Sequence, residues 1–164
     1  MKTLYLISGT MGIGKTAVSH QLKINLPNSV FLDGDWCWDA NPFQVTEETK
    51  KMVIHNICYL LNNFIRCSAY KNVIFCWVMD NQTIIDGILK ELHTGNCKVN
   101  KISLIADEIT LRDRLNVDIA AGTRTADIID RSISRMSMYH DLDTIKIDTS
   151  NKTVREIVDE IMML

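Results

Sequence analysis

Short apolar runs alternate along this chain of 164 residues with stretches in which apolar residues recur at helical spacing. The runs predict five strands, over residues 3–8, 29–32, 72–79, 101–106 and 144–148. The helical spacing predicts helices over residues 47–66, 81–93, 125–139 and 153–163, and another after the first strand. Thr46 is the expected N-cap of the second helix, since two glutamates follow it in the first turn.

The predicted strands are continuously apolar rather than alternating, and helices separate them. This pattern is typical of a parallel sheet that is covered on both faces. We therefore expect an α/β fold, with five parallel strands in a three-layer domain over residues 1–164. Ligands of such sheets bind at the carboxyl ends of the strands, so the chemistry is expected just after residues 8, 32, 79, 106 and 148.

Amino-acid composition limits which binding partners and which cellular location are expected for this chain. A formal net charge of −2 gives no broad basic field, so no nucleic-acid partner is expected. The five cysteines are odd in number and show no C-x-x-C spacing, which argues against disulfides and zinc and favours a reducing, cytoplasmic location. The longest apolar run, 73–79, is too short to cross a bilayer, and no signal-peptide pattern precedes the first strand. A monomer and a dimer are equally compatible with these data.

The sequence GTMGIGKT, residues 9–16, follows the first strand and fits the phosphate-binding pattern G-x-x-x-x-G-K-S/T. Glycines let such a loop wrap phosphates with its N–H groups, and the next helix adds its positive dipole end. Lys15 is expected to reach the β- and γ-phosphates of ATP, and the Thr16 hydroxyl to ligate Mg²⁺. The predicted nucleotide-binding residues here are Gly9, Gly12, Ile13, Gly14, Lys15, Thr16 and Ala17.

Two carboxylates, Asp33 and Asp35, flank Gly34 directly after the second strand. Carboxylates beside large apolar side chains are costly unless something pairs with them. Because parallel strands end at one rim, these residues are expected near the phosphate loop. The alternative is that they only shape a turn.

The N-terminal loop and the D-G-D sequence resemble those of the small P-loop kinases grouped around shikimate kinase, gluconate kinase, adenylylsulfate kinase and chloramphenicol phosphotransferase. The resemblance implies the adenylate-kinase-like P-loop NTPase fold with a small lid. It implies that Asp33 holds Mg²⁺, directly or through water. It also implies that Asp35 orients or deprotonates the acceptor hydroxyl, the one proton acceptor that phosphoryl transfer needs.

The same resemblance suggests roles for three arginines between the fourth and fifth strands. Arg114 is similar to an adenine-side arginine, and Arg124 to an arginine of a lid, here approximately residues 114–126, that closes over the phosphates. Arg135, four residues before Tyr139, is similar to one that faces substrate or phosphate. The alternative is a solvated, salt-bridged helix pair, because acidic residues are interspersed. The spare candidates are Arg112 and Arg131.

Two further strand ends carry open alternatives. Residues 148–151, including Thr149, resemble the loop that touches adenine in the family, but they can also cap the last helix. Asp80 follows an apolar run and resembles a Walker B acid on the Mg²⁺ or substrate side, but Asp80 or Asn81 can instead cap the next helix.

The acceptor is expected to be a small hydroxyl compound that is not strongly anionic. The arginine that shikimate kinases place early in the following helix is missing, and only Lys50 and Lys51 stand there. Aromatic residues after Asp35 either stack on a flat acceptor or pack over the core. They are Trp36, Trp38 and Phe43.

The sequence thus predicts a Mg-ATP-dependent kinase that phosphorylates a small-molecule hydroxyl. The alternatives are a nucleoside or nucleotide kinase and a non-catalytic NTP-binding regulatory protein. Phosphorylation of polynucleotide 5′ ends is disfavoured by the absence of a basic stripe.

Overall fold

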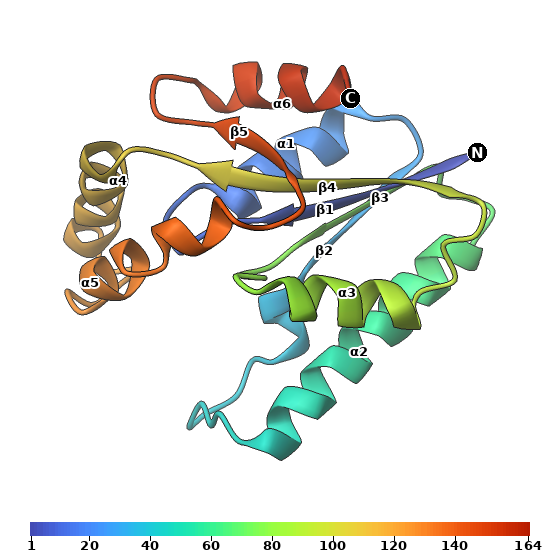
Figure 1. The fold of residues 1–164 in the computed structure, drawn as a ribbon, viewed down its shortest axis with the longest axis horizontal. Helices are drawn as coiled ribbons and strands as arrows, with labels where there is room; N and C mark the ends of the chain where they lie inside the picture. The colour runs from blue at the N-terminus through green and yellow to red at the C-terminus, as the bar shows by residue number, and fades with distance from the viewer.

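The computed structural model describes residues 1–164 as a five-stranded sheet between helical layers (Figure 1). All pairings are parallel, and the strand order is β2-β3-β1-β4-β5. The strands are β1 (Lys2–Ser8), β2 (Ser29–Asp33), β3 (Asn72–Cys76), β4 (Cys97–Ile105) and β5 (Ile145–Asp148). The predicted α/β fold with five parallel strands is confirmed.

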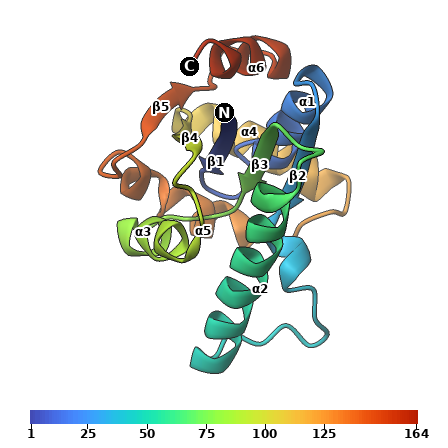
Figure 2. The same ribbon diagram turned by 90° about the vertical axis from the view of Figure 1, so that its right-hand side faces the viewer.

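Helices cover both faces of the sheet. The α-helices are α1 (Lys15–Asn25), α2 (Glu47–Arg66), α3 (Gln82–Glu91), α4 (Glu108–Ala120), α5 (Ile128–Ile133) and α6 (Val154–Met162). Two short 3-10 helices are η1 (Gly34–Cys37) and η2 (Met136–Tyr139). Figures 1 and 2 show α1 and α6 on one side of the sheet and α2 and α3 on the other. No helix combines the length and the apolar character that a membrane crossing needs.

Burial on both faces explains why the strands read as unbroken apolar runs. In β1, Tyr5 and Ile7 belong to a core cluster of 17 buried residues beneath α1, α4 and α6. Leu4 and Leu6 point the other way, into a cluster of 16 residues with α2 and α3. β1 therefore contributes apolar side chains to two cores.

Side-chain caps fix where several helices begin. Thr46 accepts from the Thr49 amide in a capping box, so the predicted N-cap of α2 is confirmed. Asn81 caps α3 by accepting from the Thr83 amide at 2.8 Å, which decides between Asn81 and Asp80 as the cap. Thr153 caps α6.

Three predicted boundaries were wrong. β3 ends at Cys76 rather than at residue 79, because the chain leaves the sheet after the Trp77 amide has made a last bond to β1, although Met79 is still buried. β4 begins at Cys97, four residues before the predicted start, because Lys2 of β1 offers it a pairing partner. The helix predicted over 125–139 is divided into α5 and η2. The expected lid, approximately residues 114–126, takes in the last part of α4 and most of the 121–127 connection between α4 and α5.

Candidate active site

The loop between β1 and α1 has a backbone that requires glycine. Gly12 and Gly14 have φ angles of 79° and 105°, in the region that L side chains rarely adopt. A Cβ on Gly12 would lie 2.4 Å from Cδ2 of Leu115, so α4 packs directly against the loop. A Cβ on Gly14 would meet no protein atom within 4 Å, and Gly14 lines an open cavity. The loop is thus a cradle that is bare of side chains where a phosphate would lie.

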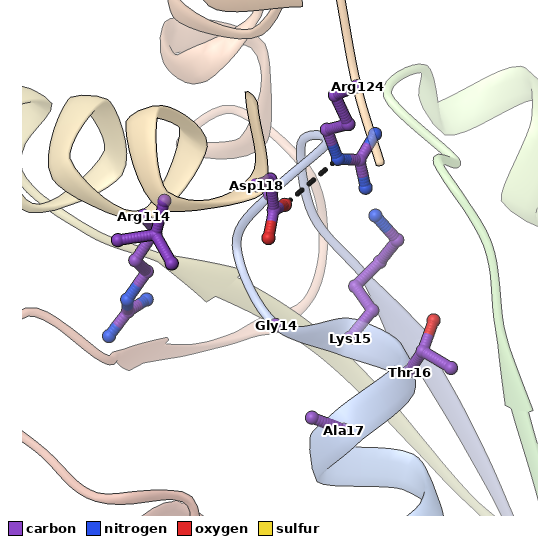
Figure 3. A pocket seen from close by; sticks show the side chains of 9 residues that line it. Gly14, Lys15, Thr16, Ala17, Arg114, Asp118 and Arg124 are labelled. Atoms are coloured by element: carbon purple, nitrogen blue, oxygen red, sulfur yellow. Dashed lines mark hydrogen bonds and ion pairs between the residues drawn. The ribbon is translucent and has the colours of Figure 1, made fainter. Parts of the chain in front are cut away.

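Lys15 begins α1 and folds back over the loop, where its ammonium donates to the Thr10 carbonyl at 3.0 Å. Burial lowers the pKa of Lys15, and the charge of Arg124 acts in the same direction, while the Asp35 and Asp33 carboxylates oppose them. Figure 3 shows the Lys15 ammonium and the Arg124 guanidinium turned toward one another. Two cations that converge on one space favour an anion between them.

A cavity of about 500 Å³ opens between the loop and α4 (Figure 3). Its lining residues are Gly12, Gly14, Lys15, Thr16, Ala17, Arg114, Val117, Asp118 and Arg124. Arg124, from the 121–127 connection, is held at the rim by Asp118, with 3.0 Å between its Nε and the carboxylate oxygen. Both side chains are partly exposed, so this ion pair is weak and can be exchanged for another anion.

Arg114 joins three segments that lie far apart in the sequence. From α4 it donates to the Ile13 carbonyl of the loop at 3.1 Å, and to the Thr149 hydroxyl and carbonyl oxygens at 2.9 and 2.7 Å. Thr149 follows β5 and is fully buried. The structure therefore brings together Arg114, Thr149 and the phosphate loop.

Thr16 and Asp33 offer a pair of oxygens suited to Mg²⁺. The Thr16 hydroxyl donates to Oδ2 of Asp33 at 2.7 Å, and Asp33 is only 6% exposed. Mg²⁺ in nucleotide enzymes is typically held by one or two such protein oxygens together with phosphates and water. No cluster of three or more His, Cys, Asp or Glu side chains stands ready for a metal. The donor set thus fits a Mg²⁺ ion that arrives with a nucleotide.

Asp35 lies in η1, two residues after Asp33. Its amide donates to Oδ1 of Asp33 at 3.1 Å, and its own Oδ1 accepts from the indole N–H of Trp77 at 3.1 Å. Partial burial of the carboxyl group raises the pKa of Asp35, and the charge of Asp33 raises it further, against the opposing effect of Lys15. A carboxylate that is more basic than usual is a better proton acceptor.

Arg135 and Asp80 contact one another. Their side chains form an ion pair of 3.4 Å, and Asp80 forms no hydrogen bond with Thr16 or Asp33. The Tyr139 hydroxyl donates to the Val78 carbonyl at 2.9 Å and so fastens η2 to the segment after β3.

The aromatic residues after Asp35 are partly open to solvent. Trp36 and Phe43 are 60% and 59% exposed. Trp36 lies edge-on to Phe31, and Trp38 packs on Phe43 with 4.7 Å between ring centroids.

Sequence reasoning missed three residues that shape the site. Trp77 bonds to Asp35, Asp118 holds Arg124, and the Thr10 hydroxyl donates to the Ser132 carbonyl at 2.8 Å. None of the three had a usable signal in the sequence, and Trp77 fell inside the strand predicted over 72–79, where an aromatic residue is ordinary.

Comparison with known proteins supports the kinase-like architecture. A family model described as AAA domain matches residues 6–130. The chain is 26% identical over 171 residues to a shikimate kinase of Bacillus cytotoxicus, covering 99% of this chain and 97% of that protein. Among solved structures, it resembles the tunicamycin resistance protein of Deinococcus radiodurans with a TM-score of 0.77 and 19% identity, over 99% of this chain and 95% of the other. A gluconokinase of Sinorhizobium meliloti gives a TM-score of 0.69 at 15% identity, over 98% and 90%. The predicted resemblance to small P-loop kinases and the P-loop NTPase fold are confirmed.

Proposed function

The chain belongs to the AAA domain family, and from this premise we propose that it is a Mg-ATP-dependent kinase that phosphorylates a hydroxyl group of a small molecule. One observation carries the proposal: the cations of Lys15 and Arg124 converge on the space beside the loop, and the carboxylate of Asp35 is near enough for both charges to act on it. A protein that only binds nucleotide needs the loop but has no use for a basic carboxylate next to it.

The nucleotide would occupy the cavity along α4. Backbone N–H groups of the loop and the N-terminus of α1 would hold its phosphates. The guanidinium of Arg114 already donates hydrogen bonds to the Ile13 and Thr149 oxygens, which fix the group in place. What such an arginine has left to offer the nucleotide base is its planar face, on which an aromatic ring can stack.

Thr16 and Asp33 would hold Mg²⁺ through their oxygens. When bound, the ion neutralises charge on the phosphate oxygens. Lys15 and Arg124 would supply positive charge from the protein, where negative charge concentrates during transfer. Asp35 would accept the proton of the acceptor hydroxyl as that oxygen forms its bond to the γ-phosphorus, while the bond from this phosphorus to the bridging oxygen breaks and ADP leaves. Such a proton acceptor contributes about 10²- to 10⁴-fold to the rate.

The charges on the acceptor side favour a substrate that is not strongly anionic. Arg135 is neutralised by Asp80, and Lys50 pairs with Glu47 on the surface. The names of the relatives point to different acceptors, shikimate in one and gluconate in another, and neither is carried over to this chain. The exposed ring of Trp36 supports an acceptor with a flat or apolar part.

Transfer from γ-labelled ATP in the presence of Mg²⁺ tests the proposal. The acceptors to compare are nucleosides, sugar acids, shikimate-like acids and neutral antibiotics that carry hydroxyl groups. Labelling of one class that requires Mg²⁺ is the expected result. Tight binding of ATP without labelling of any acceptor class would favour the non-catalytic NTP-binding protein instead.

A further inference from the structure

We propose that Trp77 is a positioning residue for the reaction, whose indole N–H fixes one oxygen of Asp35 and leaves the other oxygen for the acceptor hydroxyl. This inference rests on the proposed function, because it assigns a role to Trp77 through Asp35.

Asp35 is held at both ends. Its backbone amide donates to Oδ1 of Asp33 at 3.1 Å, which fixes the start of η1. Its Oδ1 accepts from Nε1 of Trp77 at 3.1 Å, and no other hydrogen bond holds the side chain. Oδ2 is left without a protein partner. An indole N–H is a donor only, so it can serve Asp35 solely by binding a carboxylate oxygen.

Trp77 is itself anchored by the sheet. In the parallel register of β2 and β3, Asp33 lies beside Cys76. The residues that follow these two strand ends, Gly34 and Trp77, are therefore neighbours as well. The Trp77 amide donates to the Ile7 carbonyl of β1 at 3.1 Å, which extends the ladder one residue past β3. The indole therefore projects from a rigid backbone rather than from a free loop.

The glycine between the two aspartates makes room for this indole. A Cβ on Gly34 would lie 2.5 Å from Cγ and 2.6 Å from Cδ1 of Trp77, well inside van der Waals contact. The backbone of Gly34 is not in the left-handed region, so its conformation does not demand glycine. The glycine is explained by the indole packed on it. Asp33, Gly34, Asp35 and Trp77 thus form one unit.

Two variants disturb this unit differently. Trp77→Phe keeps an aromatic ring but removes the N–H, and Gly34→Ala keeps the indole but pushes it away. For both, we expect kcat to fall about tenfold or more, with the KM for ATP within about twofold of the unmodified protein. The matched controls are Tyr70→Phe, an aromatic ring on the loop before β3, and Gly87→Ala, where a Cβ meets nothing within 4 Å. Both controls are expected to keep kcat. A purely structural role would instead lower the melting temperature and leave kcat unchanged below it, and that result would overturn the proposal.

A second measurement does not need the reaction. The indole proton of Trp77, assigned with Trp77→Phe, is followed by NMR as it exchanges with solvent. Asp35→Ala removes the acceptor, and we expect the exchange to become about tenfold faster or more. An unchanged exchange rate would show that Trp77 does not hold Asp35, whatever the turnover. If instead exchange responds but no acceptor is ever labelled, the contact stands and the proposed function fails.

Discussion

Replacing Arg114 by methionine should destabilise the protein far more than the same change two residues earlier. The variant keeps much of the apolar stem but loses the bonds to the Ile13 carbonyl and to both oxygens of Thr149. Each hydrogen bond to a charged group is worth about 1.5–3 kcal/mol, and water at the cavity edge would replace part of it. We therefore expect a loss of about 2–4 kcal/mol in the free energy of unfolding. For a chain of this size that lowers the melting temperature by about 4–16 °C.

Arg112→Met is the matched control on the same helix. Arg112 is exposed and makes one bond, to Glu108 at 2.8 Å, in an i,i+4 pair. Such pairs contribute about 0.3–0.5 kcal/mol, so the control should unfold within about 2 °C of the unmodified protein. Urea and thermal unfolding followed by far-UV circular dichroism measure both variants. Equal losses for the two variants, or no loss for Arg114→Met, would refute the view that Arg114 fastens the phosphate loop to the segment after β5.

Three further changes probe the loop, the lid and a helix cap. Arg124→Ala should change the free energy of unfolding by less than about 1 kcal/mol, because the ion pair of Arg124 is half exposed. Initial rates of phosphoryl transfer should nevertheless fall by about 10³-fold or more, and equal rates would remove Arg124 from the mechanism. Gly12→Ala should cost about 2–5 kcal/mol in urea unfolding, because alanine is strained at a φ of 79° and would clash with Leu115; full stability would contradict the geometry of the loop. Asp107 caps α4, and its hydrogen bond from the backbone N–H of Thr110 lowers the pKa of its carboxyl group. The cap therefore stabilises the protein fully above the pKa that Asp107 has in the unfolded chain. This stabilisation is lost as the pH falls through the lower pKa of the folded protein. The stability difference between the unmodified protein and Asp107→Ala should therefore shrink from about pH 6 to about pH 3, and a constant difference would argue against the cap.

The fold was largely predictable because burial on both faces of a parallel sheet leaves a strong local signal. The run that contains Leu4 and Ile7 is apolar without alternation, and a helical pattern follows it. Together these two features predicted a central strand. The same signal misled at residues 77–79, where Met79 is buried by side-chain packing without belonging to a strand. Hydrophobicity reports burial, and burial does not require a strand.

The division between α5 and η2 could not be predicted because its causes lie elsewhere in the chain. Neither proline nor glycine interrupts residues 125–139. The Thr10 hydroxyl donates to the Ser132 carbonyl, and Asp80, which follows β3, pairs with Arg135. Such tertiary contacts override local helical preference.

The candidate site also combines residues that a local pattern predicts with residues that only tertiary packing brings together. Gly12, Lys15 and Thr16 belong to one contiguous motif with a known mechanical purpose, so the sequence alone predicted the cradle. The arginines could be proposed only by resemblance, and which oxygens Arg114 binds depends on how α4 packs against the loop. Trp77 was not foreseen, because a tryptophan at a strand end is ordinary until its partner is known.

The central claim is that Asp35 accepts the proton of the acceptor hydroxyl, and Asp35→Asn tests it most directly. Asparagine has the same shape and can still accept from Trp77, but it cannot take up the proton. Turnover with the acceptor found in the labelling experiment and the Kd for ATP should be measured on both proteins. The account predicts a fall in kcat of about 10²- to 10⁴-fold, with the Kd for ATP changed by no more than a few fold. Normal turnover in Asp35→Asn would contradict it.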